Sequence, residues 1–321
     1  MPSLLPDACW VVHDGKAGNR RQAMALAAAM QLDIHEWTLP ASLGARWFAP
    51  RKFPGFKSAF GWEFSDALMR APPALAIGCG RLAALATRMA RDTGAKSIQI
   101  LDPRIDPDLW DLVVAPAHDR LVGSNVLAMS GSLSPVDAGW LARARAEFPA
   151  LSRLPSPRTA VLLGGPTAAT RFDRSALEVL CSKLEYQLAG DGGSVMICGS
   201  RRTPAAWAAL MRERYAHEQQ HLVWMDAGDG VNPYPGVLGW ADRIIVSPDS
   251  VNMISEACAT SAPVFVAEPN RATGRIGSFI ASLLERGRVL PQTRDCAPFP
   301  AIALEETRRV AALVRERLSR H

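Results

Sequence analysis

The sequence predicts an α/β protein built from two doubly wound domains, each with a parallel sheet. Short runs rich in β-branched residues alternate with longer helical patterns along nearly the whole chain, which is typical of parallel βα units. Glycine-containing turns follow these runs and open the next helix. A stretch rich in proline and serine, residues 149–157, interrupts the pattern near the middle of the chain.

The composition excludes several classes of protein. With 48% hydrophobic and 21% charged residues, the 321-residue chain is globular rather than disordered, coiled-coil or collagen-like. No run approaches the roughly 18 apolar residues of a membrane span, and residues 1–7 lack the basic start of a signal peptide. The six cysteines show neither CxxC nor CxxH spacing. We therefore expect a cytoplasmic protein with reduced cysteines in its core.

The predicted strands and helices come in two series. The first series has strands at 9–13, 34–39, 75–77, 97–101, 112–114 and 126–129, with helices at 20–30 and 82–91. The second has strands at 159–163, 194–197, 222–225, 243–246 and 263–266, with helices near 173–189, 203–216, 250–259 and 275–286. We predict domains at 1–150 and 151–303, and a final helix within 304–321 that could pack on either domain. Ligands are expected in a cleft shared by the carboxyl ends of the two sheets.

Polar and glycine residues follow the first predicted strand. Gly15, Lys16 and Gly18 lie in a strand-to-helix turn, where backbone N–H groups favour an anion. A tight turn with a solvated Lys16 explains these residues equally well, and the motif is neither a P-loop nor G-x-G-x-x-G. The nearby Asn19 and Gln22 favour the binding interpretation.

Three side chains of the first domain are candidate acids or bases. Asp14 and Asp102 follow the first and fourth strands, and His118 follows the fifth. Groups at strand ends face the expected ligand site, where a carboxylate or imidazole can transfer protons. A lone histidine is still more often structural. The turn at 78–81 is interpreted as a packing turn, although Arg81 could face the ligand site.

Two turns of the second domain are candidate ligand sites, and the second of them suits a phosphate or pyrophosphate. Gly164 and Gly165 close its first strand and leave room for a ligand close to the backbone. After the second strand, Arg201 and Arg202 flank a helix start for which Thr203 is a suitable N-cap and Pro204 a suitable first-turn residue. A capped helix with two solvated arginines explains the second turn equally well.

The most informative stretch is 245–258, a strand that ends in a polar turn and continues as a helix. Ser247, Asp249 and Ser250 lie at the helix start, and Glu256 follows among small apolar residues. A buried carboxylate there costs several kcal/mol unless it is hydrogen-bonded, so a ligand diol is an attractive partner. An internal ion pair to arginine is the alternative.

Taken together, these motifs resemble the bacterial relatives of the plant elongated-mitochondria (mitochondrial fission ELM) family. The resemblance is carried by the turns just described, by Asp-Gly-Lys-Ala-Gly-x-x-x-Gln, Asp-Pro-Arg and Ala-Pro-x-His-Asp in the first half, and by Asn232-Pro233-Tyr234. It extends from about Trp10 to Glu268. The family in turn looks like GT-B glycosyltransferases and, more distantly, like the MurG type.

The resemblance implies a GT-B-like fold with a nucleotide-sugar donor on the C-terminal domain and the acceptor on the N-terminal one. It implies donor-binding roles for Gly164, Gly165, Thr167, Ser200, Arg201, Arg202, Ser247, Asp249, Ser250, Met253 and Glu256, the last toward the ribose hydroxyls. Gly15, Lys16, Gly18, Asn19 and Gln22 would lie on the acceptor side. Several relatives carry histidine where this chain has Asn19, so a base would be Asp14, Asp102 or His118.

A basic aromatic segment, residues 45–57, suits a membrane interface or single-stranded nucleic acid. Packing of its aromatic rings into the domain core is an equally good explanation. Nothing else in the chain resembles an RNA-binding module, so we expect no nucleic-acid partner. The net charge of +5 permits an anionic partner without identifying it.

Together with the motifs, the resemblance implies an inverting, metal-independent glycosyltransferase that uses a nucleoside-diphosphate sugar, with UDP-sugars favoured, and needs no cofactor. The acceptor would be a cell-envelope glycan or a lipid-linked molecule, which places the protein in the cytoplasm, with peripheral contact to the inner face of the membrane. The alternatives are a nucleotide-sugar epimerase or hydrolase, and a non-catalytic scaffold that binds nucleotide sugars. A Rossmann dehydrogenase is disfavoured because the first turn lacks G-x-G-x-x-G.

Overall fold

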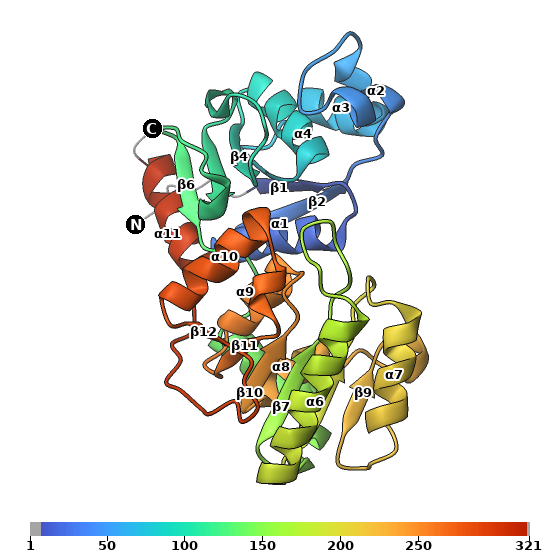
Figure 1. The fold of residues 1–321 in the computed structure, drawn as a ribbon. Coiled ribbons are helices and arrows are strands. Elements are labelled where there is room, and N and C mark those ends of the chain that lie inside the picture. The colour runs from blue at the N-terminus through green and yellow to red at the C-terminus, as the bar shows by residue number, and fades with distance from the viewer. Residues whose placement is uncertain (1–7, 320–321) are drawn as a thin grey trace. The chain divides into compact units, whose positions relative to one another are not determined.

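The computed structural model describes residues 8–319, and contacts within the chain divide it into two compact units (Figure 1). Among the described residues, unit 1 comprises 8–135 and 305–319, and unit 2 comprises 136–304. The segment 1–7, from which we expect no signal peptide, lies outside the described residues. The unit boundary falls at Pro135, whereas the sequence pattern placed it at residue 150.

Tertiary packing explains the position of this boundary. Helix α5 (Ala138–Glu147) precedes the proline-rich stretch but packs against α8 (Tyr234–Trp240) of unit 2. Trp140 of α5 joins the core of unit 2, and the indole of Trp240 donates a hydrogen bond to the carbonyl of Phe148. The last helix, α11 (Glu306–Ser319), returns to unit 1, where Val310 and Val314 are fully buried.

Unit 1 contains a six-stranded parallel sheet in the order β2-β1-β3-β4-β5-β6. Its strands are β1 (Ala8–His13), β2 (Asp33–Thr38), β3 (Leu75–Cys79), β4 (Lys96–Ile100), β5 (Leu112–Pro116) and β6 (Val126–Met129). All six were predicted. The chain runs from β1 to β2 on one side and then returns to β3 on the other, so the topological switch point lies between β1 and β3.

Helices cover both faces of this sheet because both faces of its strands are apolar. Cys9 and Val11 of β1 belong to a core cluster with α1 (Ala17–Ala29) and α11. Trp10 and Val12, which point to the opposite face, belong to a cluster with α3 (Trp62–Arg70) and α4 (Arg81–Asp92). The short helix α2 (Leu43–Phe48) contacts α4, and its Ala45 belongs to the same cluster.

Unit 2 contains a second six-stranded parallel sheet in the order β12-β11-β10-β7-β8-β9. Its strands are β7 (Arg158–Leu162), β8 (Ser194–Cys198), β9 (Leu222–Trp224), β10 (Arg243–Val246), β11 (Val264–Val266) and β12 (Val289–Pro291). The first five were predicted, and β12 was not. Strands β8 and β9 extend from one side of β7, and β10, β11 and β12 from the other, so the switch point lies between β7 and β10.

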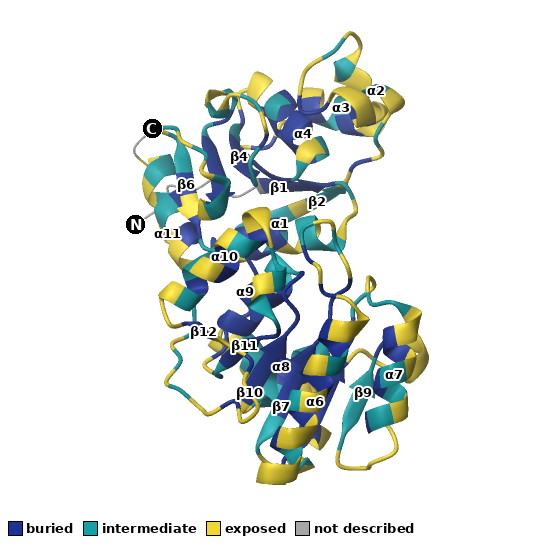
Figure 2. Cartoon of the chain, viewed as in Figure 1, coloured by how far each residue is buried: buried dark blue, intermediate teal, exposed yellow. Residues whose placement is uncertain are grey.

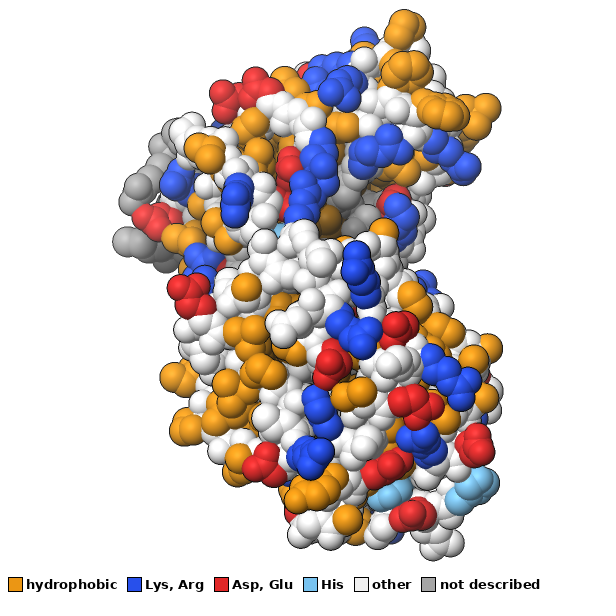
Figure 3. All heavy atoms as spheres, in the orientation of Figure 1, with side chains coloured by type: hydrophobic (Ala, Val, Ile, Leu, Met, Phe, Trp, Pro, Cys, Tyr) orange, Lys and Arg blue, Asp and Glu red, His pale blue; other side chains and the backbone are white. Residues whose placement is uncertain are grey.

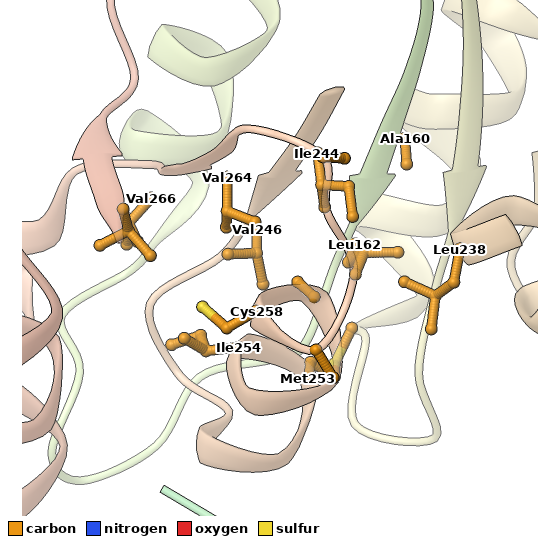
Figure 4. Packing of buried hydrophobic residues seen from close by; sticks show 14 of the residues in the cluster. Ala160, Leu162, Leu238, Ile244, Val246, Met253, Ile254, Cys258, Val264 and Val266 are labelled. Atoms are coloured by element: carbon orange, nitrogen blue, oxygen red, sulfur yellow. The ribbon is translucent and has the colours of Figure 1, made fainter. Parts of the chain in front are cut away.

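The helices of unit 2 also form two layers. Helices α6 (Arg174–Asp191) and α7 (Ala205–Tyr215) share a cluster with Val161, and α8, α9 (Val251–Cys258) and α10 (Gly274–Glu285) share one with Leu162. Figure 4 shows Ile254 and Cys258 of α9 in this second cluster. The strands are largely buried and the outer helix faces exposed (Figure 2). Short 3-10 helices complete the fold: η1 (Phe56–Ser58), η2 (Pro107–Leu109), η3 (Ala117–Asp119), η4 (Pro149–Arg153), η5 (Ala227–Asp229) and η6 (Pro269–Arg271).

The six cysteines are buried and free, as the sequence predicted. Burial raises the pKa of Cys9 to about 12 and that of Cys181 to about 11. None of the helices within residues 8–319 combines the length and the apolar character needed to cross a membrane. The same residues contain no group of three or more histidine, cysteine or acidic side chains placed to hold a metal ion.

Candidate functional site

The switch point of unit 2 brings together the turns predicted to bind a donor. Strands β10, β7 and β8 are adjacent and parallel, so their carboxyl ends lie at one edge of the sheet. Gly164 and Gly165 follow β7, Ser247 and Asp249 follow β10, and the turn beginning at Ser200 follows β8. In doubly wound sheets, ligands bind outside the carboxyl ends at such a switch point.

The carboxylate of Asp249 holds these three turns together. Its Oδ2 accepts hydrogen bonds from the backbone N–H of Gly165 (2.9 Å) and from Nη2 of Arg202 (2.8 Å). Its Oδ1 accepts a hydrogen bond from Oγ of Ser247 (2.6 Å), which accepts one from the backbone N–H of Gly164 (2.8 Å). The side chain of Asp249 is completely buried. A buried carboxylate that receives three hydrogen bonds is stabilised, so the turns are fixed relative to one another.

The two glycines are needed for this arrangement. A Cβ atom on Gly164 would lie 1.9 Å from Oδ2 of Asp249, and one on Gly165 would lie 1.9 Å from the carbonyl oxygen of Arg202. The close approach predicted for a ligand is therefore already made by the protein's own polar atoms. Further along this turn, the hydroxyl oxygens of Thr167 and Thr170 lie 2.8 Å apart.

The turn after β8 differs from its prediction. Helix α7 begins at Ala205, with Pro204 at the N-cap position and no side-chain cap, so Thr203 is not the N-cap. The hydroxyl of Thr203 instead donates to the carbonyls of Leu163 (3.0 Å) and Gly164 (2.7 Å), and it accepts a hydrogen bond from the backbone N–H of Ser200 (2.8 Å). This hydroxyl ties the turn to the end of β7. Arg201 is exposed beside it.

The turn after β10 leads into α9 as predicted. Ser250 is the N-cap residue, and its Oγ accepts a hydrogen bond from the backbone N–H of Met253 (3.3 Å). Met253 is buried and packs on the sheet, near Leu162 and Val246 (Figure 4). The start of α9 is thus anchored at the switch point.

Glu256 is buried on α9, and a tyrosine contacts its carboxylate. The side chain of Tyr234, the first residue of α8, donates a hydrogen bond of 2.6 Å to Oε2 of Glu256. Only 2% of Glu256 is exposed. The predicted burial is confirmed, and the structure adds the phenol of Tyr234 as a partner.

In unit 1, the turn predicted to lie on the acceptor side is closed by Asp14. Oδ1 of Asp14 accepts hydrogen bonds from the amide of Asn19 (3.0 Å) and the backbone N–H of Lys16 (3.2 Å), and Nζ of Lys16 lies 2.9 Å from Oδ2. Burial raises the pKa of Asp14, but the hydrogen bonds from Lys16 and Asn19 outweigh this and leave the pKa below its ordinary value. A carboxylate with a lowered pKa is a weak base, which counts against Asp14 as the proton acceptor.

The switch point of unit 1 involves the same turn. A Cβ atom on Gly80, which follows β3, would lie 2.4 Å from Nδ2 of Asn19, so glycine permits this contact between the two turns. Gly15 has a φ of +77°, and Gly18 lies in the first turn of α1. The amide nitrogen of Gln22 lies 3.5 Å from the carbonyl of Gly18, and its Oε1 is buried with no hydrogen-bond partner within the described structure.

Three residues that the sequence did not assign to a site support this turn. Nδ1 of His13 accepts a hydrogen bond from the backbone N–H of Gly15 (3.1 Å), so we assign the ring proton to Nε2, which lies 2.7 Å from Oε1 of Glu36. Arg20 donates to both oxygens of Glu36, at 2.5 and 2.8 Å. The hydrogen bond from Arg20 lowers the pKa of Glu36 to about 2 despite some burial, and His13 adds to the effect.

The other two base candidates lie at the same edge of the unit 1 sheet. Asp102 follows β4, and its Oδ1 accepts a hydrogen bond from the backbone N–H of Arg104 (2.8 Å). His118 lies in η3, directly after β5. Leu101, the residue before Asp102, has a φ of +74°, a left-handed conformation that is unfavourable for a residue with a side chain. Backbone strain of this kind is often found at functional sites.

The structure adds hydrogen-bond partners that are distant in the sequence from the candidate residues. Tyr234 lies 22 positions before Glu256, and Glu36 lies 23 positions after His13. The motif Asn232-Pro233-Tyr234 had been noticed as part of the family resemblance, but no role was assigned to Tyr234. No pattern in the sequence pointed to Glu36.

Comparison with known protein families identifies the family of the chain. The family model described as "Mitochondrial fission ELM1" matches residues 17–318. The chain belongs to this family. It is 30% identical over 245 residues to the mitochondrial fission protein ELM1 of Arabidopsis thaliana, in an alignment that covers 68% of the chain and 56% of the plant protein. The chain thus spans a little over half the length of this relative. A protein of Rickettsia prowazekii (strain Madrid E), the uncharacterized protein RP120, is 23% identical over 321 residues, with 86% of the chain and 88% of that protein covered.

Solved structures with a similar fold include a UDP-GlcNAc 2-epimerase and a glycosyltransferase. The UDP-GlcNAc 2-epimerase from Methanocaldococcus jannaschii matches with a TM-score of 0.58 and 10% identity. The match covers 96% of the present chain and 99% of the epimerase chain. CalG4, the calicheamicin glycosyltransferase, matches with a TM-score of 0.50 and 13% identity, covering 98% and 93%. These likenesses confirm the predicted GT-B-like fold with two Rossmann-like domains.

Proposed function

We propose that the protein transfers a sugar from a nucleoside-diphosphate sugar, with UDP-sugars favoured, to a cell-envelope glycan or lipid-linked acceptor. It would do so in the cytoplasm, at the inner face of the membrane, and without a cofactor. The observation that carries the proposal is the buried carboxylate of Glu256 on the helix that starts at the switch point of unit 2. The GT-B-like fold, shared with a glycosyltransferase and a UDP-GlcNAc epimerase, supports it.

The donor would be held by unit 2. The carboxylate of Glu256 would accept hydrogen bonds from the hydroxyls of a ribose, and Tyr234, which donates to its Oε2, would orient it. The exposed Arg201, together with the half-exposed Arg202, supplies positive charge for a diphosphate beside the start of α9. Asp249 would act indirectly, because its oxygens already hold Gly165, Ser247 and Arg202 in place.

The reaction would be a direct displacement. The oxygen of the acceptor hydroxyl forms a bond to the anomeric carbon while the bond from that carbon to the diphosphate oxygen breaks, and the electron pair leaves with the nucleoside diphosphate. The proton of the hydroxyl passes to a base, for which Asp14, Asp102 and His118 are the candidates. Positive charge near the leaving diphosphate stabilises the transition state. The anomeric configuration inverts, and no metal ion takes part.

Product analysis tests the proposal. The protein is incubated with UDP-GlcNAc and other nucleotide sugars, with and without a membrane-lipid extract as acceptor, and in EDTA. We expect free nucleoside diphosphate to form faster with the extract, with no effect of EDTA, and we expect Asp102→Asn or His118→Gln to slow its formation at least tenfold. If no nucleoside diphosphate is released under any of these conditions, the proposal is refuted in favour of a non-catalytic scaffold.

A second candidate is an epimerase or hydrolase that converts the nucleotide sugar alone. The fold likeness to the UDP-GlcNAc 2-epimerase favours it. Incubation with the donor alone separates the two reactions, because an epimerase or hydrolase needs no acceptor. Conversion of the donor at equal rates with and without the lipid extract would select this second function.

A further inference from the structure

Large hydrophobic side chains are exposed on one part of unit 1. They are Leu43, Trp47 and Phe48 of α2 and Trp62 and Met69 of α3, which we call the α2–α3 patch. Trp47 is 79% exposed and Trp62 is 74% exposed. In the described part of unit 1, Val122 is the other exposed large hydrophobic residue. Figure 3 shows hydrophobic and basic side chains side by side over this part of the unit. Monomeric soluble proteins rarely leave such a cluster uncovered without a use for it.

The exposure of this patch does not reflect poor folding, because its inner side is well anchored. Ala45 and Ala49 of the same segment are buried in the core of the unit, together with Phe64 of α3. Two arginines of α4 bind the backbone of the segment: Arg81 donates to the carbonyl of Ala49 (3.2 Å) and Arg88 to that of Pro50 (2.7 Å). The segment therefore holds its aromatic side chains outward on a fixed support.

Some aromatic rings of residues 45–57 pack against the core of unit 1, and others are exposed to solvent. Phe53 and Phe56 are half-buried and pack against the core, as the core interpretation predicted. Trp47 and Phe48 are exposed instead, and Phe48 stacks on Phe53 with ring centres 5.6 Å apart. The core interpretation therefore holds for Phe53 and Phe56 but not for Trp47 and Phe48.

The charge around the patch is mainly positive. Exposed basic side chains are interleaved with the hydrophobic ones: Arg46, Arg51, Lys52, Lys57 and Arg70. Between residues 43 and 70, acidic side chains occur at Glu63 and Asp66, and Asp66 forms an ion pair with Arg70. Lys52 is paired with Asp92 of α4, whose Oδ2 lies 2.7 Å from its Nζ. An excess of positive charge remains, which is complementary to an anionic surface.

We infer that the α2–α3 patch docks on an anionic lipid bilayer. Tryptophan and phenylalanine rings are favourable at the level of lipid headgroups, and arginine and lysine beside them attract anionic lipids. Leu43 and Met69 favour a bilayer over single-stranded nucleic acid, because aliphatic side chains bury well in lipid but do not stack on bases as rings do. The inference does not depend on sugar transfer, since the binding is measured without any substrate.

Vesicle flotation tests the inference with the full-length protein. Binding is measured to vesicles of phosphatidylcholine alone and of phosphatidylcholine mixed with phosphatidylglycerol, at low and high salt. Two double variants remove the patch chemistry: Trp47→Ser with Phe48→Ser, and Arg51→Glu with Lys57→Glu. Matched controls change exposed residues of unit 2: Val231→Ser with Ile302→Ser, and Arg143→Glu with Arg153→Glu. Circular dichroism and thermal unfolding confirm that each variant is folded.

We expect salt-sensitive binding to the mixed vesicles, weaker binding to phosphatidylcholine, and little effect of the control variants. Each basic residue near an anionic surface strengthens binding about fivefold, so both patch variants should lose at least tenfold in affinity. The inference is overturned if the folded wild-type protein does not float with either vesicle, or if the patch variants bind as well as the wild type.

Two other occupants give distinct results, and either would overturn the inference. A wild-type dimer that becomes monomeric in the Trp47→Ser, Phe48→Ser variant, as measured by light scattering, would make the patch a contact between two copies. Tighter binding to a fluorescent single-stranded oligonucleotide than to mixed vesicles would make it a nucleic-acid surface.

Discussion

The hydroxyl of Tyr234 donates a 2.6 Å hydrogen bond to Oε2 of Glu256, and it does so from the first turn of a different helix. A carboxylate that is 2% exposed is costly without such a donor. The phenol therefore provides a hydrogen-bond donor to one oxygen of this buried carboxylate and orients it. The residue that would recognise a ribose is held by a partner 22 positions away in the sequence.

Replacement of Tyr234 by phenylalanine removes this hydrogen bond and keeps the ring. We expect Tyr234→Phe to lower the free energy of unfolding by about 1 kcal/mol and to weaken nucleotide-sugar binding about tenfold. Urea unfolding and isothermal titration calorimetry measure the two effects. The matched control is Tyr186→Phe, an exposed tyrosine, which should change neither. Equal affinities of Tyr234→Phe and the wild type would show that this hydrogen bond does not orient a binding group.

The glycine turn after β7 should not tolerate a side chain. In Gly164→Ala the new Cβ would collide with the buried carboxylate of Asp249, whose hydrogen bonds to Gly165 and Ser247 would have to break. We expect a loss of about 2 kcal/mol or more in the free energy of unfolding, measured by urea denaturation.

The control for this prediction is Gly190→Ala. A Cβ atom on Gly190, within α6, meets no other atom within 4 Å. Since alanine favours helix more than glycine does, this variant should be as stable as the wild type or slightly more stable. Equal effects of the two substitutions would contradict the proposed role of Asp249 in fixing the turn.

The ion pair between Arg20 and Glu36 should make stability depend on acid pH. The pKa of Glu36 is lowered from 4.5 to about 2 in the folded protein, first by Arg20. A lowered pKa gives stability that is present above about pH 4.5 and is lost as the pH falls toward 2.

Arg20→Gln removes the main cause of this shift. We expect it to lower the free energy of unfolding by about 1 kcal/mol at pH 7, after allowance for the partial exposure of the pair, and by progressively less below pH 4.5. Chemical unfolding across this pH range measures the difference. Arg70→Gln, which breaks the exposed pair with Asp66, serves as the control and should have little effect at any pH. A constant difference between Arg20→Gln and the wild type down to pH 2 would contradict the assignment.

The cysteines should be inert in the folded protein. All six are buried, and burial raises the pKa of thiols such as Cys258, to about 12, so little reactive thiolate forms at neutral pH. We expect almost no reaction with Ellman's reagent under native conditions and six reactive thiols in denaturant. Rapid reaction of one or more thiols in the folded protein would indicate local opening that the structure does not show.

Local sequence patterns predicted most of the fold, since each strand of the two sheets except β12 falls in a run that the sequence pattern identified. Strand β12 was missed because Val289, Leu290 and Pro291 form too short a run, and its proline is tolerated at the sheet edge. The boundary between the units was placed too late because the proline-rich stretch 149–157 was interpreted as the linker, whereas α5, which precedes it, packs on α8 of unit 2.

The candidate site was predicted only in part, because local patterns identify single turns but not the contacts between them. Turns after strands identify residues such as Gly164 and Asp249, because the position after a strand is a local property. The hydroxyl of Thr203 looked like a helix cap, yet it bonds to the carbonyls of Leu163 and Gly164, forty residues earlier. Contacts over such separations depend on strand order, which a single sequence does not display.

The central claim is that Glu256 lies in a nucleotide-sugar site of unit 2. The most direct measurement is the thermal shift of the protein with a panel of UDP-, GDP-, ADP- and CMP-sugars, for the wild type, Glu256→Ala and Tyr234→Phe. We predict a rise in the unfolding temperature with one nucleotide class, with UDP-sugars favoured, which is lost in Glu256→Ala and reduced in Tyr234→Phe. No rise with any nucleotide sugar, or an equal rise in the wild type and Glu256→Ala, would contradict the claim.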